Sequence, residues 1–350
     1  VPLIAIIPVV VFTKYKINYK VVVFLTAAFL LSYLLYRMTK GLMLDRKAVQ
    51  ATRIYQYFEN PLNFPHDFID KISAGFNSLG FYVKMLLWPN KMACYYGYAT
   101  IPIFSFGSFY ALIGVAVAAL LGYVFFTRFK KPDILWFGVV FFVGFISMYL
   151  NVVIPAAGIV ADRFMFFASI GFSIVVVCLV LKLDKTKTKI AKWKDLKLSQ
   201  KAIPATILVI FTFLIINRNS EWRSKSVLFA ADVKKYPESV KLSLLTTSQL
   251  IIDLNNKEKA DALSNNDKLK KIREAEITLK KAIKTDSSCG GCYNNLSFMY
   301  LTFERNPAEA LPYLKLGYKL DTTKKEMICN LGIAYFRLGD IENAKKYLFL

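Results

Sequence analysis

The sequence predicts an all-α fold in two parts, a polytopic bundle of transmembrane helices over residues 1–216 and a solenoid of helical repeats over residues 217–350. Of the 350 residues, 55% are hydrophobic and 15% are aromatic, which is too apolar for one soluble domain of this length. The first part holds five apolar runs with almost no charge: 21–36, 101–126, 134–150, 164–181 and 202–216. The second part is polar and repeats itself at a fixed spacing.

Both ends of the chain are expected to lie inside structural elements. The apolar stretch at residues 1–12 is too short to cross a hydrocarbon layer of about 30 Å, which takes roughly 20 helical residues. It also lacks the charged segment and the cleavage site of a signal peptide. At the other end, the helical pattern of residues 343–350 breaks off. We therefore expect a fragment whose first span and last repeat are incomplete.

The formal net charge of +22 is concentrated in the first part, which has 23 Lys and Arg against 8 Asp and Glu. Three short connectors between apolar runs carry much of it: Lys14, Lys16 and Lys20; Arg128, Lys130 and Lys131; and eight lysines from Lys182 to Lys201. Such asymmetry is typical of cytoplasmic loops. Topology thus accounts for the charge, and no nucleic-acid partner is expected.

If all three connectors are cytoplasmic, an even number of spans must separate each pair of them. The weaker apolar stretch 74–88 is interrupted by Asn77, Gly80 and Lys84. Parity makes it an interfacial or re-entrant helix with Trp88 at the headgroup level. The alternative is a true span and one mis-assigned basic loop.

With 202–216 as the last span, everything after residue 217 is predicted to lie on the exterior face. The loops 38–73, 89–100 and 151–163 share that face. Any substrate chemistry should be sought there.

The second part repeats with a period of 34 to 35 residues, because Ala275, Ala310 and Ala344 each open a similar segment. Leu296 with Tyr300, and Leu331 with Tyr335, occupy matching positions before the last two of these segments. This pattern resembles the tetratricopeptide repeat, in which two antiparallel helices form each unit. An earlier helix pair is predicted at 239–253 and 269–284. Such arrays present a concave surface to peptides; the alternative role is that of a spacer or an oligomerisation scaffold.

The segment Cys289-Gly-Gly-Cys292 has the spacing of a redox or metal-binding pair. No second pair and no nearby histidine completes a zinc site. The alternative is a loop between repeats whose glycines serve the turn. The five cysteines define no disulfide framework.

Exterior candidates include Glu59, His66 and Asp67, which crowd into one loop with prolines and aromatic residues. They could carry protons, bind a metal or contact a sugar ring; the alternative is a set of turns with polar caps. Tyr95 and Tyr96 could stack on a sugar or belong to an aromatic belt at the membrane surface.

Asp162 and Arg163 lie at the very mouth of the apolar run 164–181. Charges at that depth are costly unless they are paired or face a water-filled cavity, so they indicate a functional site. A phosphate is the expected partner of Arg163, and a hydroxyl or a metal that of Asp162. The alternative is an interfacial anchor whose arginine reaches the lipid headgroups.

The order of these features is similar to that of a known family. The motifs are Glu59-Asn60-Pro61, Leu86-Leu87-Trp88-Pro89, Ala161-Asp162-Arg163, Ser169-Ile170-Gly171-Phe172, and Asn217-Arg218-Asn219 followed by Trp222. From about residue 50 onward the chain resembles the transmembrane and tetratricopeptide-repeat O-mannosyltransferases, members of the GT-C glycosyltransferase superfamily. The animal members carry Glu at the position of Asp162.

The resemblance implies transfer of a sugar, typically mannose, from a polyprenyl-phosphate donor to a protein hydroxyl, with the repeats holding the acceptor. The catalytic base of such enzymes comes from an exterior loop that would precede residue 1. The catalytic residue is therefore unknown here, and Asp162, Arg163, Glu59, His66 and Asp67 are expected to support it. No cofactor is certain, although a divalent metal is possible.

The resemblance also implies a multi-pass protein of a bacterial inner membrane with periplasmic repeats, or of the endoplasmic reticulum with luminal repeats. Two other functions remain open. One is a non-enzymatic membrane scaffold whose repeats recruit partners. The other is a ligase or flippase for lipid-linked glycans.

Overall fold

The computed structural model describes residues 55–183 and 198–349. In these two stretches the chain is helical, with an isolated bridge between Tyr96 and Val160 in place of any strand. The described residues form thirteen α-helices: α4 Phe68–Leu87, α5 Phe109–Arg128, α6 Ile134–Ile146, α7 Met165–Leu183, α8 Leu198–Glu221, α9 Lys225–Lys235, α10 Val240–Asn255, α11 Lys257–Asp261, α12 Asn265–Thr285, α13 Gly290–Thr302, α14 Pro307–Leu320, α15 Lys325–Arg337 and α16 Ile341–Leu348.

Some of the sequence expectations fall outside the described residues. These are the apolar stretch 1–12, the run 21–36, the connector around Lys16, and most of the lysine-rich connector between α7 and α8.

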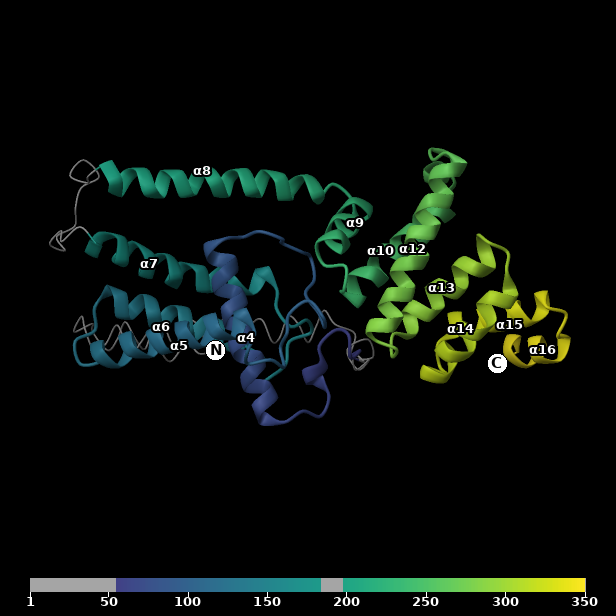
Figure 1. Cartoon of the computed structure of the whole chain (residues 1–350), viewed down its shortest axis with the longest axis horizontal. Coiled ribbons are helices and arrows are strands. Elements are labelled where there is room, and N and C mark those ends of the chain that lie inside the picture. The colour runs from purple at the N-terminus through teal and green to yellow at the C-terminus, as the bar shows by residue number, and fades with distance from the viewer. Residues whose placement is uncertain (1–54, 184–197, 350) are drawn as a thin grey trace, which may run out of the picture.

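Three of the described helices are long and apolar enough to cross a membrane. The segments are Phe109–Arg128, Asp162–Val180 and Lys201–Glu221. In the most apolar 18-residue stretch of each, only 11%, 11% and 6% of the residues are buried inside the molecule. Their apolar side chains therefore face outward, as lipid hydrocarbon requires. The shorter α6 packs against α7. Helices α5 to α8 run along the long axis at one end of the molecule (Figure 1).

The first of these helices begins later than the sequence indicated. The apolar run starts at residue 101, whereas α5 begins at Phe109, where the Ser108 hydroxyl accepts a hydrogen bond from the Ala111 amide at 3.0 Å. Such a cap satisfies one of the free amides of the first turn. Ile101 and Ile103 are 3% and 2% exposed in the preceding loop. Both belong to a buried cluster with loop residues such as Leu62 and Ile159, and not to a span.

Helix α8 also differs from expectation, because it is longer than the run 202–216 that predicted it. It continues through Asn217 and Arg218 to Glu221. The domain boundary expected at residue 217 thus lies inside a helix, and the first residues after the apolar run are fixed to the membrane half.

Helix α4 contains the interrupted stretch 74–88 and runs across the direction of α5 to α8 (Figure 1). It is not among the described helices apolar enough to cross a membrane. Gly80 lies at its crossing with α5, since a Cβ there would stand 1.9 Å from the Tyr110 carbonyl oxygen. The Asn77 amide is fully buried and donates to the Ser105 carbonyl at 3.0 Å. Two of the three interrupting residues, Asn77 and Gly80, therefore serve one close helix crossing.

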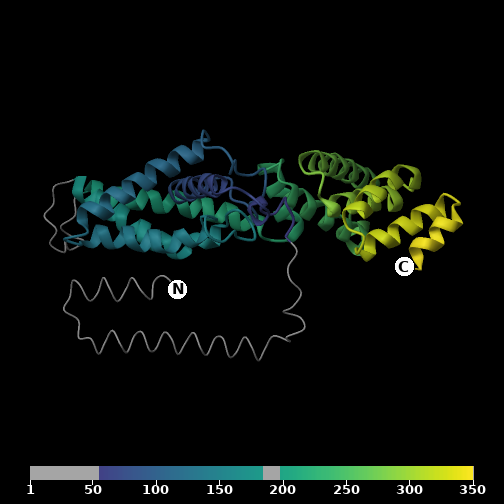
Figure 2. The ribbon, with the colours of Figure 1, turned by 90° about the horizontal axis from the view of Figure 1, so that it is seen from below.

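Beyond Pro237 the chain forms three helix pairs, α10 with α12, α13 with α14, and α15 with α16. Each pair contacts the next, and the row ends at the C-terminal end of the molecule, opposite α5 to α8 (Figures 1 and 2). The short α11 lies in the turn of the first pair, where the sequence carries a polar insertion. The predicted helices 239–253 and 269–284 correspond to α10 and α12.

The periodic alanines occupy equivalent places in the helix pairs. Ala275, Ala310 and Ala344 are 6%, 0% and 2% exposed, and each lies on the second helix of its pair. Small side chains there let the neighbouring helix approach. On the first helices, Leu296 and Leu331 are 0% and 1% exposed. Burying one such side chain stabilises the fold by roughly 1.5–3 kcal/mol relative to leaving it in water.

Candidate functional site

Three loops, at residues 55–67, 89–108 and 147–161, gather at the start of α7, between helices α4 to α8 and the helix pairs. The Tyr96 carbonyl accepts a hydrogen bond from the Ile159 amide at 3.0 Å, so the segments around residues 96 and 160 lie side by side. Asn60 joins them from the first loop, since its amide donates to the Ala156 carbonyl at 2.8 Å and to the Asn151 side chain at 3.1 Å. Three loops distant in sequence therefore form one packed unit.

Asp162 faces into this unit from the 3-10 turn Asp162–Phe164 that leads into α7. The Tyr96 hydroxyl donates to its Oδ2 atom at 3.3 Å. Its Oδ1 atom is buried and has no hydrogen-bond partner among the described residues. A buried carboxylate oxygen without a donor costs free energy, about 1–3 kcal/mol or more when charged. Asp162 therefore keeps one acceptor atom that no donor in the described part of the chain satisfies.

Tyr82 and Tyr96 complete the surroundings of this carboxylate. The Ala161 amide donates to the Tyr82 hydroxyl at 3.3 Å, and the Ala93 amide donates to the Tyr96 hydroxyl at 2.7 Å. Burial, and then the negative charge of Asp162, raise the pKa of Tyr96. The phenol therefore stays protonated and keeps donating to the carboxylate across the physiological pH range.

Arg163 points the other way. It is exposed, and its guanidinium carbon lies 4.9 Å from the centre of the Phe164 ring. That ring in turn stacks on Tyr149 with the centroids 4.1 Å apart. The two neighbouring charges thus have different surroundings, with the carboxylate turned inward and the arginine turned outward at the end of an apolar helix.

The two tyrosines expected to stack on a sugar differ in exposure. Tyr96 is 1% exposed, and its ring makes edge contacts with Phe81 and Tyr236. Tyr95 is partly exposed, and its hydroxyl donates to the Ala157 carbonyl at 2.9 Å. Tyr96 contributes its hydroxyl to the site, and the Tyr95 ring lies 5.7 Å from the Lys241 Nζ atom.

Glu59 lies apart from His66 and Asp67, which line one open pocket together with Pro65 and Asp70. Glu59 is 4% exposed and forms an ion pair with Lys241 of α10 at 2.9 Å. The His66 Nδ1 atom lies 3.3 Å from an oxygen of Asp70, and its ring stacks on Phe104. Asp67 is exposed at the start of α4. The loop thus divides these residues between the repeats and the membrane half.

No group of three or more His, Cys, Asp or Glu side chains within residues 55–183 and 198–349 is arranged to hold a metal ion. The His66 Nε2 atom is buried and lacks a hydrogen-bond partner in this part of the chain. His66 and Asp70 alone supply two ligands, fewer than the three protein ligands of an ordinary catalytic zinc site.

A buried ion network was not predicted from the sequence. Arg218 of α8 makes two hydrogen bonds to Asp232 of α9, at 2.6 and 3.1 Å, and Asp232 is fully buried. The second Asp232 oxygen also accepts from the Cys94 amide at 2.7 Å. Glu221 and Lys235 extend the network. The motif Asn217-Arg218-Asn219 marked one partner, but Asp232 lies on a separate helix, so the pair depends on how the chain turns between α8 and α9.

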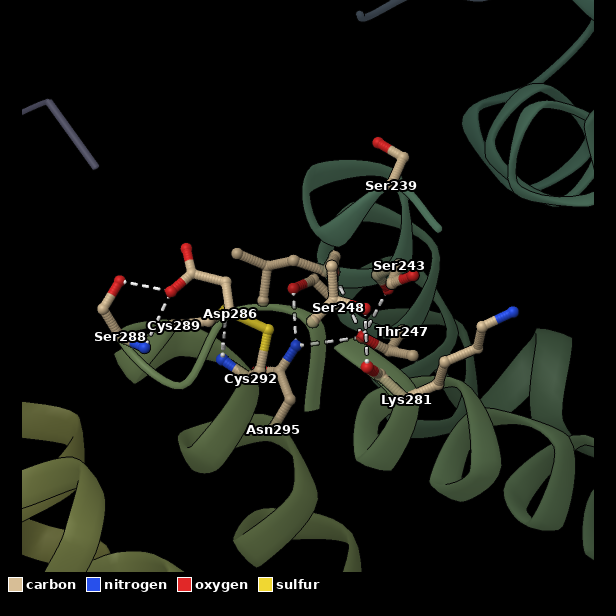
Figure 3. The surroundings of a disulfide bond; sticks show 12 residues. Ser239, Ser243, Thr247, Ser248, Lys281, Asp286, Ser288, Cys289, Cys292 and Asn295 are labelled. Carbon is tan, nitrogen blue, oxygen red and sulfur yellow. Dashed lines mark hydrogen bonds between the residues drawn. A yellow bond between two sulfur atoms is a disulfide. The ribbon is translucent and has the colours of Figure 1, made fainter. Parts of the chain in front are cut away.

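The segment Cys289-Gly-Gly-Cys292 forms a disulfide at the start of α13. Both cysteines are fully buried against α10 and α12, as Figure 3 shows. Nearby, Asn295 donates to the Ser248 hydroxyl at 2.8 Å, and Asp286 accepts from Ser288. The spacing indicated a redox or metal-binding pair or a turn between repeats, and in the structure the two sulfur atoms are bonded to each other and buried. Its buried place between two helix pairs depends on tertiary contacts that no local pattern encodes.

A scan of the chain against protein-family models finds no match, and no curated protein matches it.

Proposed function

We propose that this chain is part of a membrane glycosyltransferase that moves a sugar from a polyprenyl-phosphate donor to a serine or threonine hydroxyl on the exterior face. The observation that carries the proposal is Asp162, which lies at the mouth of an apolar helix beside the exposed Arg163. One of its oxygens is buried without a hydrogen-bond partner in the described part of the chain. Mannose is the sugar that the family resemblance implies.

Arg163 and Asp162 suit two different parts of such a donor, its phosphate and its sugar. A prenyl tail stays among the outward-facing apolar side chains of helices such as α7, while its phosphate reaches the membrane surface. Arg163 is placed there to pair with a phosphate, for which its planar guanidinium is suited. Asp162 accepts a hydrogen bond from a hydroxyl of the sugar or of the acceptor.

We also propose that the helix pairs are tetratricopeptide-type repeats that hold the acceptor. The spacing of 34 to 35 residues and the buried alanines on equivalent helices support this. The buried disulfide supports an exterior position, because disulfides persist in oxidising compartments such as the periplasm or the endoplasmic reticulum lumen. We further propose that the chain crosses the membrane several times, with its basic connectors on the cytoplasmic side.

The test is transfer of mannose from polyprenyl-phosphate mannose to serine-containing peptides by the full-length protein. Arg163→Ala should lower kcat/KM by about ten- to a hundredfold, since a hydrogen bond to a charged group contributes roughly 1.5–3 kcal/mol. Asp162→Asn should lower it as well. The matched control is Arg128→Ala, at the opposite end of α5 from the exterior loops.

Unchanged turnover in Arg163→Ala would contradict the phosphate assignment. If the wild-type protein transfers no sugar, the result favours one of the two alternative functions. A membrane-anchored repeat scaffold would still bind partners through α10 to α16, and a ligase or flippase would move a lipid-linked glycan without a peptide acceptor.

A further inference from the structure

The loop before α4 contacts the helix pairs through Phe58. Phe58 is 3% exposed and belongs to the same buried cluster as Val240 and Cys289. Its carbonyl accepts from the Tyr98 amide at 3.0 Å. Gly97 permits this approach, because a Cβ there would stand 2.6 Å from the same carbonyl oxygen. The side chain of Phe58 thus packs with the repeats while its backbone is held by the other exterior loops.

An ion pair lies beside this contact. The Lys241 Nζ atom is 2.9 Å from the Glu59 carboxylate, and it lies 5.8 and 5.7 Å from the ring centres of Phe58 and Tyr95. Lys241 stands in the first turn of α10, the first helix of the array. Because Glu59 is 4% exposed, loss of Lys241 would take a cationic partner from a buried carboxylate, which is unfavourable. We call Phe58, Glu59, Tyr95 and Lys241 the docking contact.

Hydrogen bonds of two adjacent residues, Tyr95 and Tyr96, join the docking contact to the candidate site. Tyr95 is fixed by its hydrogen bond to the Ala157 carbonyl, and the adjacent Tyr96 donates to Asp162. The same short segment is held from α9, since Asp232 accepts from the Cys94 amide and Lys235 donates to the Met92 carbonyl at 3.2 Å. In Figure 2 the chain near residue 60, in purple, lies against the green α9–α10 region.

We propose that the repeat array is held as one rigid body against the membrane mouth, and that Lys241 is the positioning residue that fixes it there. This inference rests on the proposed function in one respect. If the array holds the acceptor, a rigid attachment sets the distance from the bound segment to Asp162. The enzyme then modifies hydroxyls at one spacing from that segment.

The first experiment needs no activity. Spin labels are placed on the exposed Cys329 and on Tyr123→Cys of α5, in the full-length protein with Cys94 and Cys178 changed to alanine. The expected result is one narrow distance distribution, which broadens in Lys241→Gln and narrows again in Lys241→Arg. Lys234→Gln, an exposed lysine on α9, is the matched control and should leave the distribution narrow. Thermal unfolding checks that each variant is folded.

A broad distribution in the parent protein would overturn the rigid attachment, and a narrow one in folded Lys241→Gln would overturn the positioning role of Lys241. The conservative arginine separates the ion pair from the bulk of the side chain, because it restores the charge with a different shape.

The second experiment uses peptides that carry one serine at successive distances from a common array-binding segment, with polyprenyl-phosphate mannose as donor. Wild-type protein should favour one spacing, and Lys241→Gln should lose that preference and spread over neighbouring spacings. An identical spacing profile in Lys241→Gln would overturn the positioning role. If no peptide is mannosylated, the proposed function fails, and the distance measurement still decides whether the array is rigidly held.

Discussion

Helices α5 and α13 belong to the two halves of the molecule and place their apolar residues in opposite ways. Of the 20 residues of α5, only Ala111 and Gly114 are buried, whereas seven of the 13 residues of α13 are buried. The neighbouring helix pairs cover α13, and α5 presents its side chains outward. The stability of α13 therefore depends on its protein neighbours, and that of α5 on a bilayer. Between the two halves lies a junction held by buried charges.

The largest effect is expected at that junction, because Arg218 is the cation that makes two hydrogen bonds to the fully buried Asp232. Arg218→Met leaves the fully buried Asp232 without its guanidinium partner. Breaking a buried pair in this way costs about 3–5 kcal/mol. The measurement is the thermal unfolding of the purified protein, with Arg223→Met, at a nearby exposed arginine, as the control. Equal losses in both variants would contradict the network.

Within the repeats the burial pattern predicts a large difference between two leucines of α14. Leu314 is fully buried and Leu316 is 50% exposed. Leu314→Ala should destabilise the array by about 2–5 kcal/mol through lost burial and the cavity left behind. Leu316→Ala should change the free energy of unfolding by less than about 0.5 kcal/mol. Denaturant unfolding measures both, and similar values would show that the packing differs from the one described.

The sequence predicted these two halves well because each depends on a periodic signal. Apolar runs located α5, α6 and α7, and the spacing of Ala275, Ala310 and Ala344 located the second helices of the pairs. Element ends were less well predicted. The apolar Ile101 and Ile103 continue the run of α5 in sequence but pack in a loop, because hydrophobicity alone does not distinguish a lipid-facing residue from a core residue.

The junction could not be predicted from the sequence because its contacts join residues far apart in the chain. Glu59 and Lys241 are 182 positions apart, and Cys94 and Asp232 are 138 apart. No local period relates such partners. Asp162 was identified because its place at the end of an apolar run is a local signal, whereas its contact with Tyr96 depends on how two loops meet.

A smaller effect is expected from the disulfide, which closes a very short loop. A Cys289→Ser and Cys292→Ser double variant should lose about 2 kcal/mol in the chain-entropy account of such a loop. A reducing agent should bring the wild-type protein to the same stability and leave the variant unchanged. Unfolding with and without reductant makes the comparison, and no response of the wild-type protein would mean that the bond does not support the repeats.

The smallest effect concerns thiol reactivity. Burial, and then a hydrogen bond with Asp232, raise the pKa of Cys94 to about 12. A raised pKa leaves only about one thiol in ten thousand ionised at pH 8, and the thiolate is the reactive form. Cys94 should therefore resist alkylation in the folded protein, while the exposed Cys329 reacts. Mass spectrometry of alkylated peptides checks this, and rapid labelling of folded Cys94 would show that the junction is open.

The central claim is that the repeats and the loops around Asp162 lie on the same outer face. The most direct test is labelling of intact cells with a membrane-impermeant maleimide. It uses the native Cys329 of α15 and a Lys130→Cys variant just beyond the end of α5, two positions that are both exposed. We predict that Cys329 is labelled in intact cells and that Lys130→Cys is labelled only after the membrane is permeabilised. Labelling of both positions in intact cells, or protection of Cys329, would contradict the claim.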